Sequence, residues 1–463
     1  MSTDRIRSHN PADGTVLGEY KTAGKEEIRE AVSAARAAFP GWSRAALSER
    51  EAILRRFAEI LGERAEELAR ILAREIGKPL WEARTEVKAM AAKVDISIRA
   101  QQDRCAGWSD GKLSVAFRPH GVVAVLGPYN FPGHLPNGHI CPALLAGNSV
   151  LFKPSELAPA TAEATLACWR EAGLPAEVLQ VLQGGPATAS LLLEQEAIDG
   201  VFFTGSAATG KRLARRFADT PGKILALEMG GNNPLLVDLE NIADPEAARA
   251  IVLRSAFLST GQRCTCARRL ILPESADVES FLDNLLSEAA DLLIDEPFAD
   301  PEPFMGPLAG IDFPARVLEA VEGLRYHGAS TLLEPVQLCS GTGFLSPGIL
   351  DVSGCSGLPD EEIFGPVLQV CRVAGWAEAV EAANATRYGL AAGVLTEDEE
   401  RWDYARDRLR AGILNRNQPL TGASSAAPFG GIGDSGNHRP SAYFAADYCQ
   451  YPVASLHSDK CRR

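Results

Sequence analysis

Short apolar runs alternate with amphipathic stretches through the middle of the chain. Between about residues 120 and 230 the runs are continuous, as expected for strands that are covered on both faces of a sheet. The runs are Val122–Leu126, Ser149–Phe152, Val178–Leu182, Val201–Phe203 and Ile224–Leu227. Two stretches between them, Ala160–Ala172 and Ala208–Asp219, have helical spacing. Strand and helix in regular succession predict a doubly wound parallel sheet with right-handed crossovers.

A second set of apolar runs begins near residue 228. The runs are Pro234–Val237, Leu270–Leu272, Val367–Val370 and Ala391–Leu395, and the helical stretches Val278–Leu293 and Ala377–Ala385 separate them. The same alternation predicts a second α/β domain over this part of the chain.

The two outer parts of the chain have different patterns. The first hundred residues are predicted to be helical, with Ser48 and Glu51 at the spacing of a capping box. A turn at Trp108–Lys112 followed by a loosely alternating segment predicts a hairpin arm. The segment Tyr443–Leu456 has no capping residues and is predicted to be an edge strand or part of an arm.

Composition narrows the class of protein. The 463 residues contain 46 Lys and Arg against 60 Asp and Glu, a net charge of −14, which argues against nucleic acid and anionic membranes as partners. Ten cysteines at irregular spacing predict free thiols in a cytoplasmic protein and no disulfide framework. We find no secretory signal pattern and no run of 18 apolar residues. The composition indicates a soluble enzyme.

Two motifs are placed to bind a nucleotide. Thr204-Gly205-Ser206 follows an apolar run and opens a helix, with Gly210 one turn later, where backbone N–H groups and the helix N-terminus favour a phosphate. Lys153-Pro154-Ser155-Glu156 follows the Ser149–Phe152 run, so its side chains lie at the ligand-binding edge of the predicted sheet. Taken singly, the first motif is also compatible with a plain connection and the second with a solvated ion pair.

A cysteine and a glutamate lie in glycine-containing turns. Cys264, in Gly261-Gln262-Arg263-Cys264-Thr265-Cys266, is predicted to be an exposed nucleophile whose pKa backbone N–H groups lower. No cluster with zinc spacing accompanies it, so no metal is expected. Glu228 ends a strand before Gly230 and Gly231, where a raised pKa would make it a general base. The simpler alternatives are a small buried thiol and a surface carboxylate.

Asn130 ends another strand, in Pro128-Tyr129-Asn130-Phe131-Pro132. Its amide is placed to donate to an oxyanion, although asparagine is equally common in turns. These five motifs occur in the order of the aldehyde dehydrogenase superfamily, which the chain resembles essentially from end to end. The resemblance extends to two further motifs, Glu361-Glu362-Ile363-Phe364-Gly365-Pro366 and Pro428-Phe429-Gly430-Gly431.

The resemblance implies a fold with three parts. These are a Rossmann-type cofactor domain (1–102 and 120–227), an α/β catalytic domain (228–439) and a small β oligomerisation arm (103–119 and 440–463). An exposed arm is unfavourable in a monomer, so a homodimer or a dimer of dimers is expected.

The resemblance also implies a mechanism. Cys264 would attack an aldehyde to give a thiohemiacetal, and Asn130 with the N–H of Cys264 would stabilise the oxyanion, one such donor typically contributing ~3 kcal/mol. Glu228 would activate the water that hydrolyses the resulting thioester. The residues implied in cofactor binding are Lys153, Glu156, Gly205, Ser206, Gly210, Glu362 and Phe364. NAD is expected because the Glu156 carboxylate would repel the 2′-phosphate of NADP.

Four segments are similar to a branch of the family that acts on small anionic semialdehydes. They are Tyr129–His139, Glu228–Asn233, Gln262–Arg269 and Asp434–Ala442. A substrate with several carboxylates needs cations. Candidates in or near these segments are Arg263, His134, His438 and Arg439, together with His139 and Arg416. Two or three of these are expected to clamp the carboxylates, and the alternative is that several of them cap helices or pair with surface acids. Other readings are another semialdehyde or an aliphatic aldehyde as substrate, a cofactor-free thioesterase, and a non-catalytic binding protein.

Overall fold

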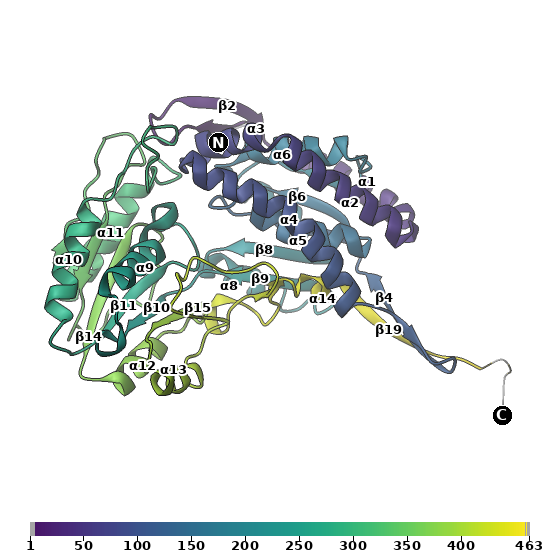
Figure 1. The fold of residues 1–463 in the computed structure, drawn as a ribbon. Helices are drawn as coiled ribbons and strands as arrows, with labels where there is room; N and C mark the ends of the chain where they lie inside the picture. Colours follow the sequence, from purple (N-terminus) through teal and green to yellow (C-terminus); the bar gives the residue numbers. More distant parts are fainter. Residues whose placement is uncertain (1–4, 459, 461–463) are drawn as a thin grey trace.

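Two parallel sheets covered by helices lie side by side, and a narrow β-arm projects from one of them (Figure 1). The computed structural model describes residues 5–458 and 460. The doubly wound α/β fold predicted from the apolar runs is confirmed. None of the described helices combines the length and the apolar character needed to cross a membrane.

The first sheet has the order β7-β6-β5-β8-β9, with all strands parallel. Its strands are β5 (Val122–Leu126), β6 (Ser149–Lys153), β7 (Leu179–Val181), β8 (Gly200–Gly205) and β9 (Ile224–Met229). Its crossover helices are α5 (His134–Ala146), α6 (Pro159–Glu171), α7 (Pro186–Leu193) and α8 (Ala207–Arg216). The strand order reverses between β5 and β8, and in such sheets ligands bind at the carboxyl ends of the strands next to this point.

Four helices precede this sheet. They are α1 (Lys25–Arg44), α2 (Leu47–Glu63), α3 (Ala65–Ile76) and α4 (Leu80–Arg104). The apolar face of α2, which includes Leu54, Phe57 and Ile60, is fully buried. Burial of one such side chain stabilises the fold by roughly 1.5–3 kcal/mol. Phe57 also stacks on Trp169 of α6, with ring centroids 3.6 Å apart.

The second sheet has the order β12-β13-β14-β11-β10-β15-β16 and is parallel except for β12. Its strands are β10 (Asn233–Val237), β11 (Ala267–Pro273), β12 (Ser330–Leu333), β13 (Gly348–Asp351), β14 (Val367–Val373), β15 (Ala391–Leu395) and β16 (Ile413–Arg416). Its helices are α9 (Pro245–Phe257), α10 (Val278–Ala290), α11 (Phe313–Tyr326), α12 (Trp376–Asn384) and α13 (Glu399–Arg406). The change of sheet between β9 and β10 lies next to the expected boundary at residue 228.

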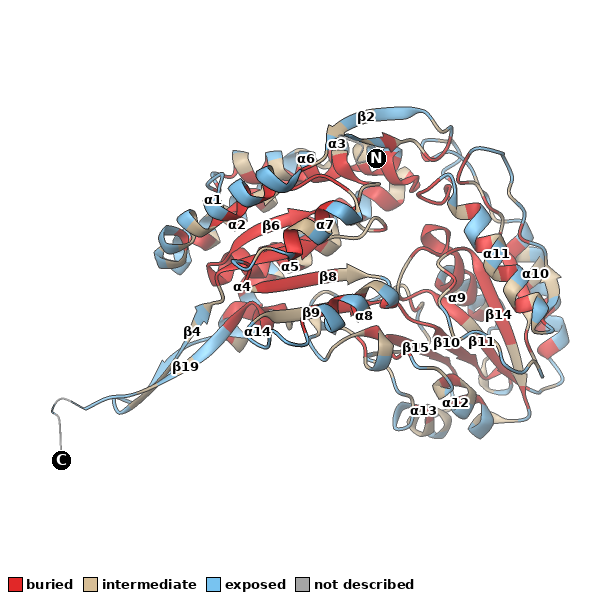
Figure 2. Cartoon of the chain, turned by 180° about the vertical axis from the view of Figure 1, so that it is seen from behind, coloured by how far each residue is buried: buried red, intermediate tan, exposed pale blue. Residues whose placement is uncertain are grey.

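The arm is a three-stranded antiparallel sheet of order β19-β4-β3. Its strands are β3 (Trp108–Ser109), β4 (Leu113–Pro119) and β19 (Gln450–Leu456). Its residues are exposed or half-buried except for Gln450, and Figure 2 shows it as a largely pale blue projection from the body. The residues just before β19 belong to the body, because β18 (Ser441–Ala442) pairs with β17 (Pro428–Phe429) and α14 (Ala445–Tyr448) packs against α4 and α5. The tail therefore joins the arm about ten residues later than expected.

The N-terminal prediction of helix alone was wrong. The described chain begins with a hairpin of β1 (Arg5–His9) and β2 (Val16–Lys21), which turns at Gly14 with φ +75°. The capping box was misplaced as well. Helix α2 begins at Leu47, and the Glu49 carboxylate accepts the N–H of Ala46 at 3.2 Å, so helix start and capping glutamate each lie two residues earlier than predicted.

Candidate active site

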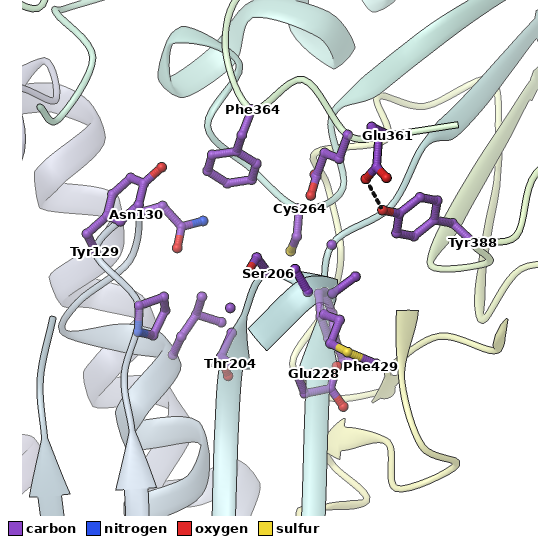
Figure 3. Close-up of a pocket in the computed structure, with 18 residues that line it drawn as sticks. Tyr129, Asn130, Thr204, Ser206, Glu228, Cys264, Glu361, Phe364, Tyr388 and Phe429 are labelled. Atoms are coloured by element: carbon purple, nitrogen blue, oxygen red, sulfur yellow. Dashed lines mark hydrogen bonds between the residues drawn. The ribbon is translucent and has the colours of Figure 1, made fainter. Parts of the chain in front are cut away.

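A cavity opens where the carboxyl ends of β5, β8 and β9 meet the second sheet, with an empty volume of about 880 Å³ that is continuous with solvent. The predicted site residues that line it are Asn130, Gly205, Ser206, Glu228, Cys264, Glu362 and Phe364. Figure 3 shows the side chains of Asn130 and Cys264 directed into the same space, with Glu228 toward the floor. Residues from five separate motifs therefore meet in one place.

Cys264 lies in a tightly wound turn between α9 and β11. Three successive residues have left-handed backbone conformations, with φ of 56° at Ser259, 55° at Thr260 and 70° at Gly261. A Cβ on Gly261 would lie 2.0 Å from the Gly365 carbonyl oxygen, so only glycine fits. The amide Nδ2 of Asn233 donates to the carbonyl oxygens of Cys264 (2.7 Å) and Cys266 (2.8 Å). The position of Cys264 is thus fixed from the backbone, and residues 259–264 are called the nucleophile turn after the expected role of Cys264.

The pKa of the Cys264 thiol is higher than expected from the sequence. Burial, together with the nearby carboxylates of Glu362 and Glu228, raises the pKa to about 12. The predicted lowering of this pKa by backbone N–H groups is therefore wrong, because desolvation and two acidic neighbours outweigh them. At neutral pH the thiol of the free protein is protonated.

Asn130 follows β5 at the point where the strand order reverses, and its side chain is 5% exposed. Its Nδ2 donates to the carbonyl oxygen of Gln262 at 2.9 Å, two residues before Cys264. The amide therefore contacts the nucleophile turn directly.

Glu228 lies near the carboxyl end of β9 and is almost completely buried. Burial raises its pKa well above the ordinary value, and a hydrogen bond with the Ser441 backbone lowers the pKa only in part. Its Oε2 atom has no hydrogen-bond partner among the described residues. The condition set by the sequence for a general base, a raised carboxyl pKa, is met.

The edge of the first sheet fits a dinucleotide. Ser206 is the N-cap of α8, and Ala207 and Ala208 in its first turn line the cavity, so free N–H groups face the space that a pyrophosphate would take. At the end of β6 the buried Lys153 Nζ donates to the Gly184 carbonyl oxygen at 2.8 Å and lies 3.5 Å from the Glu156 carboxylate. These two side chains lie outside the cavity described above, on the neighbouring strand.

Gly210 does not face the cavity. A Cβ at this position would lie 2.1 Å from the sulfur of Met229, so the glycine allows α8 to pack closely on β9. Gly210 was expected to contact the cofactor directly. Its placement instead assigns it a role in packing helix α8 on strand β9.

Glu362 is held by a buried arginine that the sequence did not single out. Arg268 Nη2 donates to Glu362 Oε1 at 3.2 Å, and Arg268 Nη1 donates to the Gly261 carbonyl oxygen at 2.7 Å. A Cβ on Gly230 would lie 1.7 Å from Glu362 Oε2, so the carboxylate rests directly on that glycine. Arg268 thereby links the nucleophile turn to Glu362.

The predicted substrate cations do not line the cavity, and within residues 5–458 and 460 no lysine, arginine or histidine does. Arg263 is committed to the Glu82 carboxylate (Nη2 to Oε1, 2.7 Å), Ser259 Oγ (2.8 Å) and the Thr421 carbonyl oxygen (3.1 Å). Burial lowers the pKa of His134 to about 4, so its ring is neutral at physiological pH. Neither residue presents a free cation to a ligand.

Neither His438 nor Arg439 lines the cavity. Gly436 bridges Glu228, and Asn437 bonds Leu225 and Leu227, so this segment runs antiparallel to β9 toward the end of the sheet opposite the cavity. The Arg439 charge accordingly acts on His120, before the start of β5.

The remaining two candidates, His139 and Arg416, are also engaged elsewhere. Burial lowers the pKa of His139 to about 3, and its ring contacts Tyr448 and Thr204, while Arg416 pairs with Glu399 at 2.6 Å. The expectation that these residues hold substrate carboxylates in the cavity is therefore not supported by their placement.

Several lining residues were missed because no local signal distinguishes them. They are Tyr129, Leu135, Thr204, Glu361, Tyr388 and Phe429. Most of them lie in motifs named in the sequence analysis, so their closeness in the sequence to a predicted site residue could have pointed to them. Tyr388 was the exception, because it lies in an unremarkable loop.

A model of the aldehyde dehydrogenase family matches residues 1–453, and the chain belongs to this family. Among curated relatives, the N-succinylglutamate 5-semialdehyde dehydrogenase of Chromobacterium violaceum is 53% identical over 454 residues, covering 97% of this chain and 93% of the relative. The protein of the same name from Chromohalobacter salexigens is 51% identical over 459 residues, covering 98% and 93%.

Solved structures agree with this assignment. The γ-glutamyl-γ-aminobutyraldehyde dehydrogenase from Burkholderia cenocepacia is 32% identical with a TM-score of 0.91, over 98% of this chain and 94% of that one. An indole-3-acetaldehyde dehydrogenase in complex with NAD+ is 31% identical with a TM-score of 0.91, over 98% and 93%.

Proposed function

We propose that the protein oxidises N-succinyl-L-glutamate 5-semialdehyde to N-succinyl-L-glutamate with NAD, in a route of arginine degradation. The observation that carries the chemistry is the meeting of Asn130, Glu228 and Cys264 in one cavity beside the N-terminus of α8. The substrate assignment is supported by relatives of that name that are about half identical over almost the whole chain.

Cys264 is proposed as the nucleophile. The thiol first loses its proton to water. Its sulfur then forms a bond with the aldehyde carbon, and the electron pair of the C=O π bond moves to the oxygen, which becomes the oxyanion of a thiohemiacetal. The Asn130 amide and the N–H of Cys264 stabilise this oxyanion, and one such donor is worth roughly 3 kcal/mol in comparable sites. Asn130 Nδ2 carries two N–H bonds, so one can stay on the Gln262 carbonyl oxygen, at 2.9 Å, while the other donates to the substrate.

Glu228 is proposed as the general base that activates water. NAD, when bound, accepts a hydride from the substrate carbon, which leaves an acyl group on Cys264. A buried carboxylate with a raised pKa takes a proton from water more effectively than one with an ordinary pKa, because its basicity is closer to that required near neutral pH. The unpartnered Oε2 is the atom free to receive the proton.

Residues along the edge of the first sheet are proposed to hold NAD. Lys153 and Glu156 would bond ribose hydroxyls, Gly205 and Ser206 would contact the phosphates at α8, and Glu362 with Phe364 would border the nicotinamide half. The Glu156 carboxylate supports NAD over NADP through charge repulsion of a 2′-phosphate.

The test compares four aldehydes with wild type and Cys264→Ala. NADH formation is followed with N-succinylglutamate semialdehyde, glutamate semialdehyde, succinate semialdehyde and an aliphatic aldehyde. A strong preference for the first, lost in Cys264→Ala, is expected. Turnover without this preference would support a dehydrogenase of another aldehyde, and no turnover of any aldehyde would contradict the proposal.

We further propose that the arm joins copies of this chain into a dimer or a dimer of dimers. Trp108, Tyr451 and Leu456 on the arm are 52%, 43% and 86% exposed, and exposed apolar side chains on an unpaired strand edge favour association. A mass near 49.4 kDa by light scattering would contradict this. The described cysteines are free thiols, which supports a cytoplasmic location.

A further inference from the structure

A buried ionic cluster lies beneath the nucleophile turn and outside the cavity. It consists of Lys78, Glu82, Glu86 and Arg263, whose side chains are between 0 and 17% exposed. Glu82 and Glu86 are one turn apart on α4, and each pairs with one cation, at 2.7 Å for Arg263 and 2.6 Å for Lys78. Ionic groups this deeply buried cost several kcal/mol each to desolvate, so their retention calls for a reason.

Glu82 contacts the nucleophile turn. Its Oε1 accepts hydrogen bonds from Arg263, the residue before Cys264, and from the hydroxyl of Ser259. Arg263 Nε also donates to Ser259 Oγ at 2.8 Å. Ser259 has a left-handed backbone, a conformation that persists only where surrounding contacts hold it. Glu82 therefore ties both ends of the strained turn to α4.

Glu86 contacts the loop that carries Asn130. Its Oε1 accepts hydrogen bonds from the N–H groups of Gly133 (3.0 Å) and His134 (3.1 Å). In this way the Glu86 carboxylate caps the N-terminus of α5. The ring of Phe131, next to Asn130, lies under both cations of the cluster, 3.3 Å from Lys78 Nζ and 5.1 Å from the Arg263 guanidinium carbon. Glu86 therefore fixes the loop that presents the amide.

We infer that Glu82 and Glu86 are a pair of positioning residues that set the separation between the nucleophile and the oxyanion donor. Helix α4 holds the Cys264 turn through Glu82 and the Asn130 loop through Glu86. These two segments come from different sheets, and α4 therefore fixes their positions relative to each other. This inference rests on the proposed roles of Cys264 and Asn130. A displacement of about 1 Å in such a pair costs ~10²-fold in rate.

The two carboxylates act on different partners, so their substitutions are distinguishable. Alkylation of Cys264 by iodoacetamide requires no oxyanion donor. Glu86→Gln is expected to lower kcat about 30-fold or more while the alkylation rate stays within twofold of wild type. Glu82→Gln is expected to lower kcat similarly and to change the alkylation rate at least fivefold. The affinity for NADH, measured by fluorescence titration, is expected to stay unchanged in both variants.

Epistasis provides the second measurement. In an Asn130→Ala background, Glu86→Gln is expected to reduce kcat by less than threefold, because its target is already absent. The double variant Lys78→Gln/Glu86→Gln restores a complementary neutral pair. Its kcat is expected to be at least tenfold higher than that of Glu86→Gln. This variant also keeps the test decisive if Glu86→Gln alone folds poorly.

Glu75→Gln is the matched control. Glu75 is also a buried carboxylate, and it caps α6 by accepting the N–H groups of Ala160 and Thr161, both at 2.8 Å. It is expected to cost stability without changing Cys264 alkylation. An equal effect of Glu86→Gln with and without Asn130, or alkylation rates that follow stability in all variants, would overturn the inference. If wild type oxidises no aldehyde but the Glu82→Gln effect on alkylation persists, the proposed function fails and the positioning of Cys264 stands.

Discussion

Adding one methyl group at Gly261 is the most direct test of how the close packing of the nucleophile turn affects stability and activity. Its φ is +70°, and a Cβ there would lie 2.0 Å from the Gly365 carbonyl oxygen, whereas ordinary contacts begin at 3.4 Å. In Gly261→Ala the two must separate by 1.4 Å, the difference between these distances. The Gly365 carbonyl is itself bound by Arg268 Nη1 at 3.3 Å, so the displacement reaches the residue that also holds Glu362.

The size of the effect follows from two contributions. Alanine in a left-handed conformation costs ~1–2 kcal/mol. Overpacking against backbone costs a further ~1–3 kcal/mol. A shift of the turn by about 1 Å also moves Cys264 and lowers kcat by ~10²-fold. Gly354→Ala is the matched control, because its φ is also +70° but nothing lies within 4 Å of the added Cβ.

The assay measures denaturation midpoints and NADH formation for both variants. Gly354→Ala is expected to lose only the conformational part of the stability and to keep wild-type kcat. Gly261→Ala is expected to lose more stability and most of its activity. If the two variants have the same midpoint and the same kcat, the reasoning from the Gly365 contact is refuted.

Three further predictions concern titratable groups. Glu228→Gln should lower steady-state kcat by ~10²–10⁴-fold while a first burst of NADH remains, and it should remove the acid limb of the kcat–pH profile. In wild type that limb lies above pH 4.5, since burial raises the Glu228 pKa and the base is lost as pH falls through it; a limb at or below 4.5 would contradict this. Because the Cys264 pKa is about 12, alkylation of the cofactor-free protein should rise ~10-fold per pH unit up to about pH 10, and a plateau below pH 9 would disprove it. Glu156→Gln should improve kcat/KM for NADP about fivefold by removing ~1 kcal/mol of repulsion, and an unchanged ratio of NADP to NAD would exclude this role.

Much of the fold was predictable because both sheets are buried on both faces. Continuous apolar runs such as Val122–Leu126 leave few alternatives to a covered parallel strand, and this run matches β5 residue for residue. The β1–β2 hairpin was missed because its strands are mostly exposed and carry no apolar alternation. Its stability depends on contacts with distant segments.

The site was predictable where a motif names residues and not where function depends on long-range partners. Arg263 is next to Cys264, yet its carboxylate partner Glu82 is 181 residues away in the sequence. The Cys264 pKa depends in the same way on Glu362 and Glu228, which the fold brings together. The positive charge of Arg263, next to Cys264 in the sequence, therefore does not predict the direction in which the Cys264 pKa shifts.

The pairing of β4 with β19 has a consequence for synthesis. Translation delivers Leu113–Pro119 long before Gln450–Leu456, so one edge of β4 has no partner while the residues between them are synthesised. Contacts between such distant segments slow folding, and an unpaired strand edge is a template for association with other chains. Among the described sheets the arm is therefore the last to close, and the yield of native protein in a cell depends on how well the unpaired edge of β4 is shielded until Gln450–Leu456 has been synthesised.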